Sequence, residues 1–340
     1  TDLEADLLAF EPDLDATGRI AVEPFDLVRL PQHLMREHAA TRSYDPDDEL
    51  DTLTQVLPFS PRFQEVMEPA IQAGAAAFIG LLTGMPWETA DYYVPYDGEA
   101  RPIPGVWVSP ANSKRVTDLM QAGPVRARLS VEALRETVTC QNVVGVLPGV
   151  SDEWLMIGSH HDGPWSSAVE DGSGIALVLA QAKYWSQVPR AERPHNLLFI
   201  VQAGHMVGGA GCRAFVDAHR PFLRQVVAEI HLEHAARECR CEDGSLIPTD
   251  APEVRWWFTS LNTELEDIVE GALRSEDLRR SLVLPPEIIG PQPTTDGAFY
   301  HLESEPIVQY LTAPMYLFDS QDTLDKIHKP SLEAVTRATI

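Results

Sequence analysis

Histidine and acidic residues that could bind a metal ion follow a predicted strand near the middle of the chain. The apolar segment 154–158 is typical of a strand, and His160 and Asp162 come directly after it. Glu170 and Asp171 follow, just before a Gly-Ser-Gly segment that opens an apolar helical run. Neutral imidazole and ionised carboxylate are ligands for divalent ions, and a further carboxylate can orient the imidazole. The pattern indicates a metal site, with a polar strand-end loop as the alternative.

Two later predicted strands also end in histidine or acidic residues. His205 follows the first of them, and His231, Glu233 and His234 lie at the end of the second. In open parallel sheets, ligands bind outside the carboxyl ends of the strands. We therefore expect these side chains to gather near His160, although a hydrogen-bonded polar layer without a metal would have the same composition.

The elements that must position these residues alternate between strand and helix from residue 142 onward. The predicted strands cover residues 143–147, 154–158, 197–202, 226–232, 254–258 and 306–310. The predicted helices cover residues 175–185, 209–218 and 263–273, with a last one from Ser331. Such alternation predicts an α/β fold in which helices cover both faces of a mostly parallel, mixed sheet.

The first part of the chain has a different pattern of predicted elements. Short predicted strands are broken by proline and by acidic loops, and no ligand-like spacing occurs there. The predicted strands cover residues 18–22, 78–81, 103–108 and 125–129, and a helix runs into residues 70–77. We expect a smaller β-rich domain over residues 1–138 and the catalytic domain over residues 139–340.

Composition excludes several classes of partner. The net charge of −25 argues against nucleic acid and anionic membranes, which attract basic surfaces. No apolar run approaches the ~20 residues that span a bilayer. Four cysteines are too few and too scattered for a disulfide framework. With no signal peptide visible, we expect a cytoplasmic protein, but the chain begins at Thr1, so compartment stays open, as does the oligomeric state.

The order of these motifs resembles the zinc aminopeptidase family, whose relatives include glutamate carboxypeptidase, glutaminyl cyclase and transferrin receptor. The matching landmarks are Gly-Ser-His160-x-Asp162, Glu170-Asp171-Gly-Ser-Gly, Gly-His205-Met206, Leu-Glu233, Thr295-Asp296 and Asp322-Thr323-Leu324-Asp325. Residues 1–138 resemble the protease-associated domain inserted in many members. The resemblance implies a phosphorylase/hydrolase-like aminopeptidase fold for the remainder.

The resemblance also implies how metal ions would bind. Members of the family hold two ions that share one carboxylate. By alignment, the first ion would take His160, Glu170 and Glu233. The two ligands private to the second ion are replaced by Met206 and Phe318, which cannot coordinate a hard or borderline cation. We therefore expect one divalent ion: zinc by resemblance, with manganese and iron as alternatives.

Roles follow for the neighbouring residues. We expect Asp162 to accept the imidazole N–H of His160; a turn-forming aspartate is the alternative. His205 stands where the family has its catalytic glutamate, so we expect it to act as general base, with a structural histidine as the alternative. Asp171 rivals Glu170 as the ligand, and strand alternation makes His231 a rival of Glu233.

Further candidates for the metal site or the pocket are His161, His234, Asp296, His301 and Trp165. We expect His234 to lie in a loop. A capping or hydrogen-bonding role is the alternative for Asp296 and His301, and a packed surface residue is the alternative for Trp165.

Together these observations predict a metal-dependent hydrolase that cleaves an amide or related C–N bond of a peptide or small molecule. Two alternatives stay open. One is a catalytically silent binding scaffold, because transferrin receptor keeps this fold without chemistry. The other is a two-metal aminopeptidase that recruits substitute ligands such as His161, His234 or His301.

Overall fold

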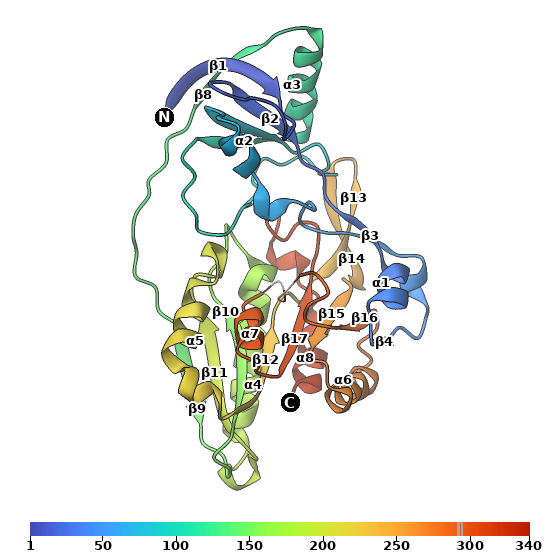
Figure 1. Cartoon of the computed structure of the whole chain (residues 1–340). Coiled ribbons are helices and arrows are strands. Elements are labelled where there is room, and N and C mark those ends of the chain that lie inside the picture. Colours follow the sequence, from blue (N-terminus) through green and yellow to red (C-terminus); the bar gives the residue numbers. More distant parts are fainter. Residues whose placement is uncertain (291–292, 294) are drawn as a thin grey trace.

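The computed structural model describes residues 1–290, 293 and 295–340, and it contains two large sheets (Figure 1). The larger sheet has eight strands. In spatial order they are β4 (Arg42–Tyr44), β16 (Ser281–Leu284), β15 (Arg255–Thr259), β17 (Ile307–Thr312), β12 (Val226–Leu232), β10 (Trp154–His160), β11 (Asn196–Gln202) and β9 (Val143–Leu147). Neighbouring strands from β17 to β11 are parallel, as are β15 and β16, whereas β4, β9 and the β15–β17 pair are antiparallel. The predicted mostly parallel, mixed sheet is confirmed.

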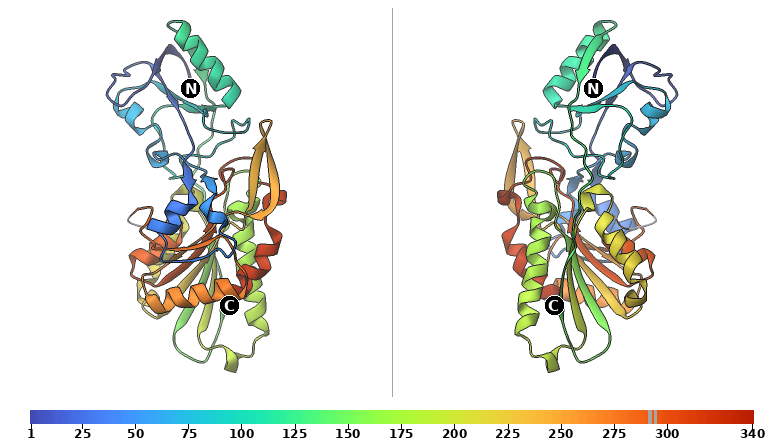
Figure 2. Two further views of the ribbon diagram at one scale, coloured as in Figure 1. Left: turned by 90° about the vertical axis from the view of Figure 1, so that its right-hand side faces the viewer. Right: turned by 90° about the vertical axis from the view of Figure 1, so that its left-hand side faces the viewer.

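Helices cover both faces of this sheet because buried strand residues alternate in direction. Met156 packs in a core cluster with side chains of α5 (Ala210–Leu223) and α7 (Gly297–Leu302). The next residue, Ile157, packs in a separate cluster with side chains of α4 (Gly174–Gln187), α6 (Thr263–Ser275) and α8 (Lys329–Ala338). Figure 2 shows α4, α6 and α8 along one side of the sheet.

The smaller sheet has five strands and lies at the opposite end of the molecule from the C-terminus (Figure 1). In spatial order they are β7 (Gly105–Val108), β6 (Ala77–Leu81), β2 (Ile20–Pro24), β1 (Asp2–Ala9) and β8 (Arg126–Ser130). Two helices accompany them, α2 (Glu68–Gln72) and α3 (Pro110–Ala122). The sheet agrees with the β-rich character expected of this region, and its assignment as a protease-associated domain stays a prediction.

Part of the first 138 residues joins the larger sheet. Strand β4 pairs with β16, and Leu50 and Leu57 pack against Trp256 in one buried cluster. The same region carries α1 (Gln32–His38) and the pair β3 (Arg29–Pro31) and β5 (Thr54–Val56). The boundary at residue 138 stays a prediction, but these segments pack with the second part of the chain.

Two features were not predicted from the sequence. The hairpin β13 (Arg237–Glu242) and β14 (Ser245–Pro252) projects from the larger sheet toward the smaller one (Figure 1). Residues 131–142 run as an extended segment from β8 to β9 without regular structure.

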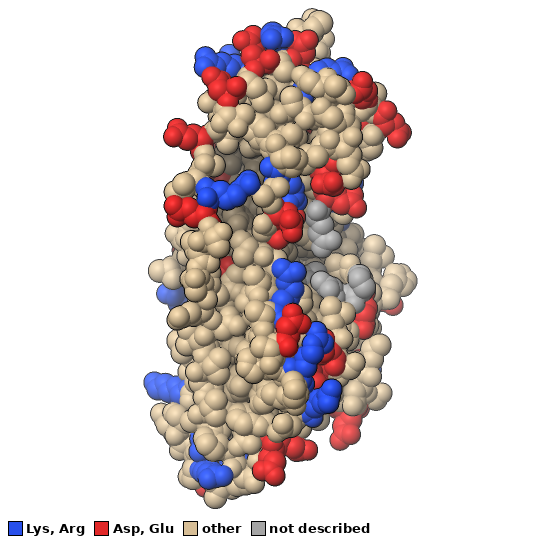
Figure 3. All heavy atoms as spheres, turned by 60° about the vertical axis from the view of Figure 1, so that its left-hand side comes forward, with Lys and Arg blue, Asp and Glu red and all other residues tan. Residues whose placement is uncertain are grey.

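Among the described residues, no helix is long and apolar enough to cross a membrane. Figure 3 shows charged side chains of both signs on the upper part of one face and, lower down, a column of both signs beside a broad uncharged area.

A buried glutamate next to β15 makes stability depend on pH. Burial, with a smaller contribution from Glu238, raises the pKa of Glu253 to about 7. As pH rises, the Glu253 carboxyl therefore ionises at a lower pH in the unfolded chain than in the folded chain. The free energy of unfolding falls between about pH 4.5 and pH 7, by on the order of 3 kcal/mol. We expect Glu253→Gln to raise the unfolding temperature by a few degrees at pH 8 and by much less at pH 5. Its carboxamide keeps an acceptor for the Val254 N–H.

Circular dichroism melts of the variant and the wild-type protein at the two pH values check this expectation. Glu242→Gln, which alters an exposed glutamate of the same hairpin region, is the control and should shift neither melt. An equal gain at both pH values would contradict the assigned ionisation.

Candidate metal centre

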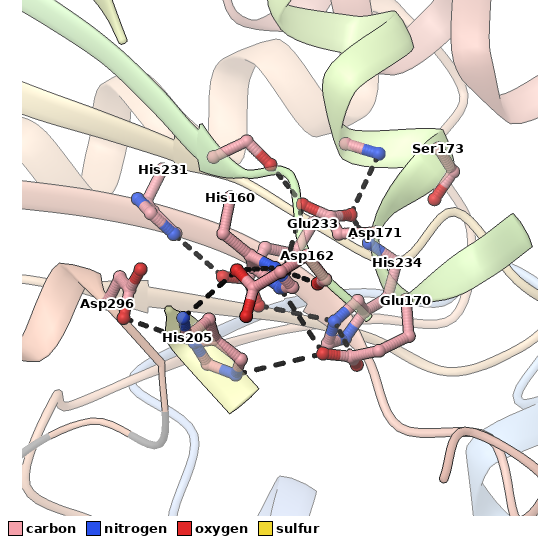
Figure 4. Close-up of polar contacts among 12 residues, drawn as sticks. His160, Asp162, Glu170, Asp171, Ser173, His205, His231, Glu233, His234 and Asp296 are labelled. Carbon is pink, nitrogen blue, oxygen red and sulfur yellow. Dashed lines mark hydrogen bonds and ion pairs between the residues drawn. The ribbon is translucent and has the colours of Figure 1, made fainter. Parts of the chain in front are cut away.

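The candidate site lies at the carboxyl ends of three adjacent parallel strands, as Figure 4 shows. His160 is the last residue of β10, and Glu233 follows β12 directly. His205 opens the short helix η5 (His205–Val207) after β11. Glu170 comes from the turn η3 (Ala168–Ser173), which precedes α4. The sheet therefore gathers residues that are up to 73 positions apart in the sequence, as the strand-end pattern predicted.

The donor atoms of these residues form two overlapping groups. His160 Nε2 lies 3.3 Å from Glu170 Oε1, and His234 Nε2 lies 2.8 Å from Glu170 Oε2 and 3.3 Å from Glu233 Oε2. Two groups have donor atoms within 4.8 Å of one another: His160, Glu233 and His234, and His160, Glu170 and His205. His160 belongs to both groups. Its Nε2 is the ring nitrogen that faces Glu170, and one imidazole nitrogen has one lone pair to give to a metal ion.

The buried polar atoms of these residues fit a cation. Among the described residues, five of these atoms face one another as close imidazole–carboxylate contacts but form no hydrogen bond of acceptable geometry. They are His160 Nε2, Glu170 Oε1 and Oε2, Glu233 Oε2 and His234 Nε2. Buried polar atoms are rarely left unpaired, because each costs roughly 1–3 kcal/mol. Two imidazoles and two carboxylates around a divalent ion would satisfy all five and match the ligands of zinc, manganese or iron.

Glu170 and Asp171 have different surroundings. The Asp171 carboxylate already accepts hydrogen bonds from the Ser159 hydroxyl and from the backbone N–H of Gly174, the latter at 2.9 Å. Both oxygens of Glu170, by contrast, face imidazole nitrogens of the cluster, Oε1 that of His160 and Oε2 that of His234. Geometry therefore favours Glu170 as the ligand and gives Asp171 a role in shaping the turn.

The turn that carries Glu170 is held by a residue to which no role was assigned from the sequence. The two carboxylate oxygens of Asp322 accept the backbone N–H groups of Val169 and Glu170 at 2.8 and 2.9 Å. Burial raises the pKa of Asp322 to about 7. The Asp-Thr motif was visible in the sequence, but nothing in its spacing indicated that Asp322 reaches the Glu170 turn.

The Asp162 carboxylate has different hydrogen-bond partners from the one expected. The imidazole Nδ1–H of His160 is 2.9 Å from the backbone carbonyl of Asp162, whereas the Asp162 carboxylate is 3.8 Å away. That carboxylate instead accepts the backbone N–H groups of His205 and Met206 at 3.1 and 3.0 Å. The prediction that the carboxylate orients His160 is therefore wrong. Donation by Nδ1 to the carbonyl still leaves Nε2 of His160 free for a cation.

His231 lies behind the cluster and orients Glu233. Its Nε2 is 2.7 Å from Glu233 Oε1, and its Nδ1 is 2.8 Å from Glu229 Oε1. Both ring nitrogens are thus engaged, and all three side chains are buried. His231 is therefore placed to support the ligand next to it. Burial raises the pKa of Glu233, but the contacts with His231 and His234 outweigh burial and lower it to about 2.

His205 pairs with Asp296 on one side and faces the cluster on the other. Its Nδ1 is 3.1 Å from Asp296 Oδ1, and its Nε2 is 3.7 Å from Glu170 Oε1. The ring stacks on His160, with centroids 4.1 Å apart. Burial disfavours the charged form of His205, but Asp296, Glu233 and Glu170 outweigh burial and raise its pKa to about 10. His205 is therefore placed as either a proton carrier or a ligand.

His234 lies in the loop after β12, as expected, and its side chain belongs to the cluster. Burial lowers the pKa of its imidazole, but Glu170 and Glu233 outweigh burial and raise the pKa to about 10. Its Nδ1 is 3.0 Å from the Thr312 carbonyl, which directs Nε2 toward Glu170. The acidic cluster thus holds positive charge on His234 and His205, where a metal cation would take the place of protons.

Apolar and aromatic side chains fill the positions aligned with the second ion of the family. Met206 and Phe318 are both buried. Tyr96 lies between Phe318 and His205, with ring centroids 5.0 and 5.8 Å away. Tyr96 comes from the first part of the chain and was missed from the sequence, because an isolated tyrosine there carries no ligand-like spacing.

Three other candidates lie outside the donor groups. His161 Nε2 is 3.0 Å from the Gln141 carbonyl, and His301 Nε2 is 2.6 Å from Glu287 Oε1. Trp165 is half exposed and packs edge to face on Tyr93. Among the described residues, therefore, the cluster recruits His234 but neither His161 nor His301.

The fold and the motifs have known counterparts. Three similar structures each cover 99% of this chain. A peptidase M28 precursor from Shewanella amazonensis has a TM-score of 0.68 and 16% identity, with 72% of its own chain covered. BSAP, a zinc aminopeptidase from Bacillus subtilis, has a TM-score of 0.65 and 16% identity, with 74% of its own chain covered. An aminopeptidase from Aneurinibacillus sp. strain AM-1 has a TM-score of 0.56 and 17% identity, with 73% of its own chain covered. At such identities the likeness shows the fold, and no curated protein sequence matches the chain.

Family membership rests on the sequence itself. Residues 142–340, more than half of the chain, match the family model described as Peptidase family M28. This segment contains every residue of the two donor groups. The chain belongs to peptidase family M28, which confirms both the resemblance drawn from the motifs and the prediction of a metal-dependent hydrolase.

Proposed function

We propose that the protein hydrolyses an amide or related C–N bond with a single divalent ion bound by His160, Glu170, Glu233 and His234. The observation that carries the proposal is that both donor groups include His160, whose Nδ1 is engaged by the Asp162 carbonyl and whose Nε2 faces Glu170. Two ions cannot share one imidazole lone pair, so a second ion would lack this ligand. The apolar side chains of Met206 and Phe318 support the same reading.

The residues divide the chemistry between them. When bound, a divalent ion polarises a carbonyl group and makes a water molecule more acidic. His205 faces the same centre through Nε2. A cation bound there would oppose protonation of the ring, and the neutral imidazole would then accept a proton from the attacking water and pass it to the departing nitrogen. Asp296 holds the ring in position through Nδ1. His231 fixes Glu233, and Asp322 fixes the turn of Glu170, so that the ligand set is held before substrate arrives.

Titration of metal-free protein tests the proposal. After removal of metal with a chelator, addition of zinc or manganese should raise the unfolding temperature and restore hydrolysis of a chromogenic amide. Both signals should saturate at about one equivalent per chain, because one site is filled. A plateau at two equivalents would favour the two-metal alternative. Binding of no metal would favour the silent scaffold and contradict the proposal.

A further inference from the structure

A segment from the first part of the chain is hydrogen-bonded to the loop that carries the proposed proton carrier. We call this segment, residues 92–98, the strap. The carbonyl of Tyr96 accepts the backbone N–H of Gly208 at 3.1 Å. The hydroxyl of Tyr93 donates to the carbonyl of Met206 at 3.3 Å. The strap therefore holds the loop through the residue on either side of Val207.

Two glycines let the strap and this loop approach each other backbone to backbone. Gly98 has φ of +73°, and a Cβ atom there would lie 2.9 Å from the carbonyl oxygen of Val207. Gly208 has φ of +77°, and a Cβ atom there would lie 2.8 Å from the carbonyl oxygen of Asp97. A larger residue at either glycine would push the two segments apart, because neither contact leaves room for a side chain.

The strap also contacts the imidazole ring of His205. Tyr96 stacks on this ring, with centroids 5.8 Å apart and an angle of 24° between the planes. The Tyr96 ring packs in turn on Phe318 and Phe63, with centroids 5.0 and 6.2 Å away. Packed side chains restrict one another, so the Tyr96 ring limits the positions that the His205 ring can adopt.

The strap is anchored to the smaller sheet. Trp107 of β7 donates its indole N–H to the carbonyl of Val94 at 3.1 Å. Arg101 donates to the two carboxylate oxygens of Asp97 at 2.6 and 3.1 Å. A displacement of β7 would therefore move the strap and, through it, the loop that follows β11.

We propose, resting on the proposed function, that the strap positions His205 for proton transfer and that Tyr96 is its positioning residue. The first part of the chain is then needed for the chemistry as well as for the packing of the fold. The strap acts on His205, whereas Glu233 and the Glu170 turn are held by His231 and Asp322. Loss of the strap contact should therefore slow turnover and leave the metal in place, because misplacement of a reacting group by about 1 Å can cost ~10²-fold in rate.

Two tyrosine variants test the role of the ring. Tyr96→Ala removes it, and Tyr96→Phe keeps it without the hydroxyl. On the metal-loaded protein with alanine p-nitroanilide, we expect Tyr96→Ala to lower kcat by at least about tenfold and to change KM by less than about threefold. Its metal content should match that of the wild-type protein, and Tyr96→Phe should keep most of the turnover. Equal losses in the two variants, loss of metal, or an unchanged kcat in Tyr96→Ala overturns the role of Tyr96.

A matched pair of glycine variants tests the backbone contact. Gly98→Ala places a methyl group against the Val207 carbonyl and should lower kcat about fivefold. Gly18→Ala is the control, because Gly18 has φ of +71° and no described atom lies within 4 Å of its Cβ position. Both variants carry the same backbone strain and should lower the unfolding temperature, but Gly18→Ala should keep its kcat. Equal kcat in the two variants overturns the contact between the strap and the loop.

A crystal structure of metal-free Tyr96→Ala tests the positioning without an activity assay. In the intact protein the His205 ring lies 4.1 Å from the His160 ring, and its Nδ1 lies 3.1 Å from Asp296 Oδ1. We expect both contacts to be lost in Tyr96→Ala and kept in Tyr96→Phe. An unmoved His205 in Tyr96→Ala overturns the inference. The proposed function fails separately, when the wild-type protein binds no ion, and the position of His205 in the variant still decides the inference.

Discussion

Replacement of His160 by alanine should abolish both bound metal and hydrolysis. His160 is the one residue common to both donor groups, and its removal leaves Glu170, Glu233 and His234 without a central nitrogen ligand. We expect metal content to fall from about one ion per chain to a small fraction, and turnover to fall by at least about 10³-fold, since the ion supplies several kcal/mol of transition-state stabilisation. Elemental analysis and an amide hydrolysis assay measure the two effects.

His161→Ala is the matched control for this variant. His161 is the adjacent histidine, and its ring contacts the Gln141 carbonyl outside the cluster. It should keep its metal and its activity. Full metal content in His160→Ala, or equal losses in the two variants, would contradict the assignment of His160.

Replacement of Asp296 by asparagine should reduce turnover strongly and leave the metal in place. Asp296 Oδ1 holds His205 Nδ1 at 3.1 Å, which directs Nε2 toward the cluster. An amide in place of the carboxylate allows the other imidazole tautomer and removes the charge that favours the protonated ring. In a comparable aspartate–histidine pair the same change costs about 10⁴ in kcat, so we expect a loss of roughly 10²–10⁴.

Three readouts separate this positioning role from a structural one. Metal content and unfolding temperature should stay close to those of the wild-type protein, and KM should change much less than kcat. Glu287→Gln is the control, because it alters the carboxylate partner of His301 outside the donor groups. If Asp296→Asn lost its metal, Asp296 would act on the metal site and the proton-carrier role of His205 would fall.

Much of the second part of the fold could be predicted from the sequence. Apolar strands separated by apolar helical runs predicted β9 to β12, α4 and α6 closely, because hydrophobic periodicity reports which face of an element is buried. The short strand β16 and the hairpin β13–β14 were missed. Strand β16 has only four residues, and the side chains of the hairpin alternate only weakly between buried and exposed.

The positions of candidate ligands could be predicted where the residues come directly after a strand and match a motif of the family. His160, Glu170 and Glu233 lie together as expected. His234 was predicted only as a further candidate, because strand periodicity stops at Leu232. The backbone of His234 has φ of 47°, a left-handed conformation that redirects the side chain into the cluster. The alternation of apolar and polar residues along a strand does not indicate such a turn.

The other features that were not predicted from the sequence depend on contacts between segments that are distant in the chain. Asp322 follows Glu170 by more than 150 residues, yet its carboxylate holds the backbone of that turn. Tyr96 reaches His205 from the first part of the chain, and β4 extends the larger sheet from the same part. Each contact depends on how the two parts pack, and no local pattern in either segment indicates it.

We expect one cation to lie among His160, Glu170, Glu233 and His234. Diffraction from a zinc-soaked crystal at the zinc absorption edge locates this ion. A single anomalous peak per chain is expected, about 2.0–2.2 Å from His160 Nε2 and from carboxylate oxygens of this set. Two peaks, or a peak on other residues such as His161 or His301, would contradict this expectation.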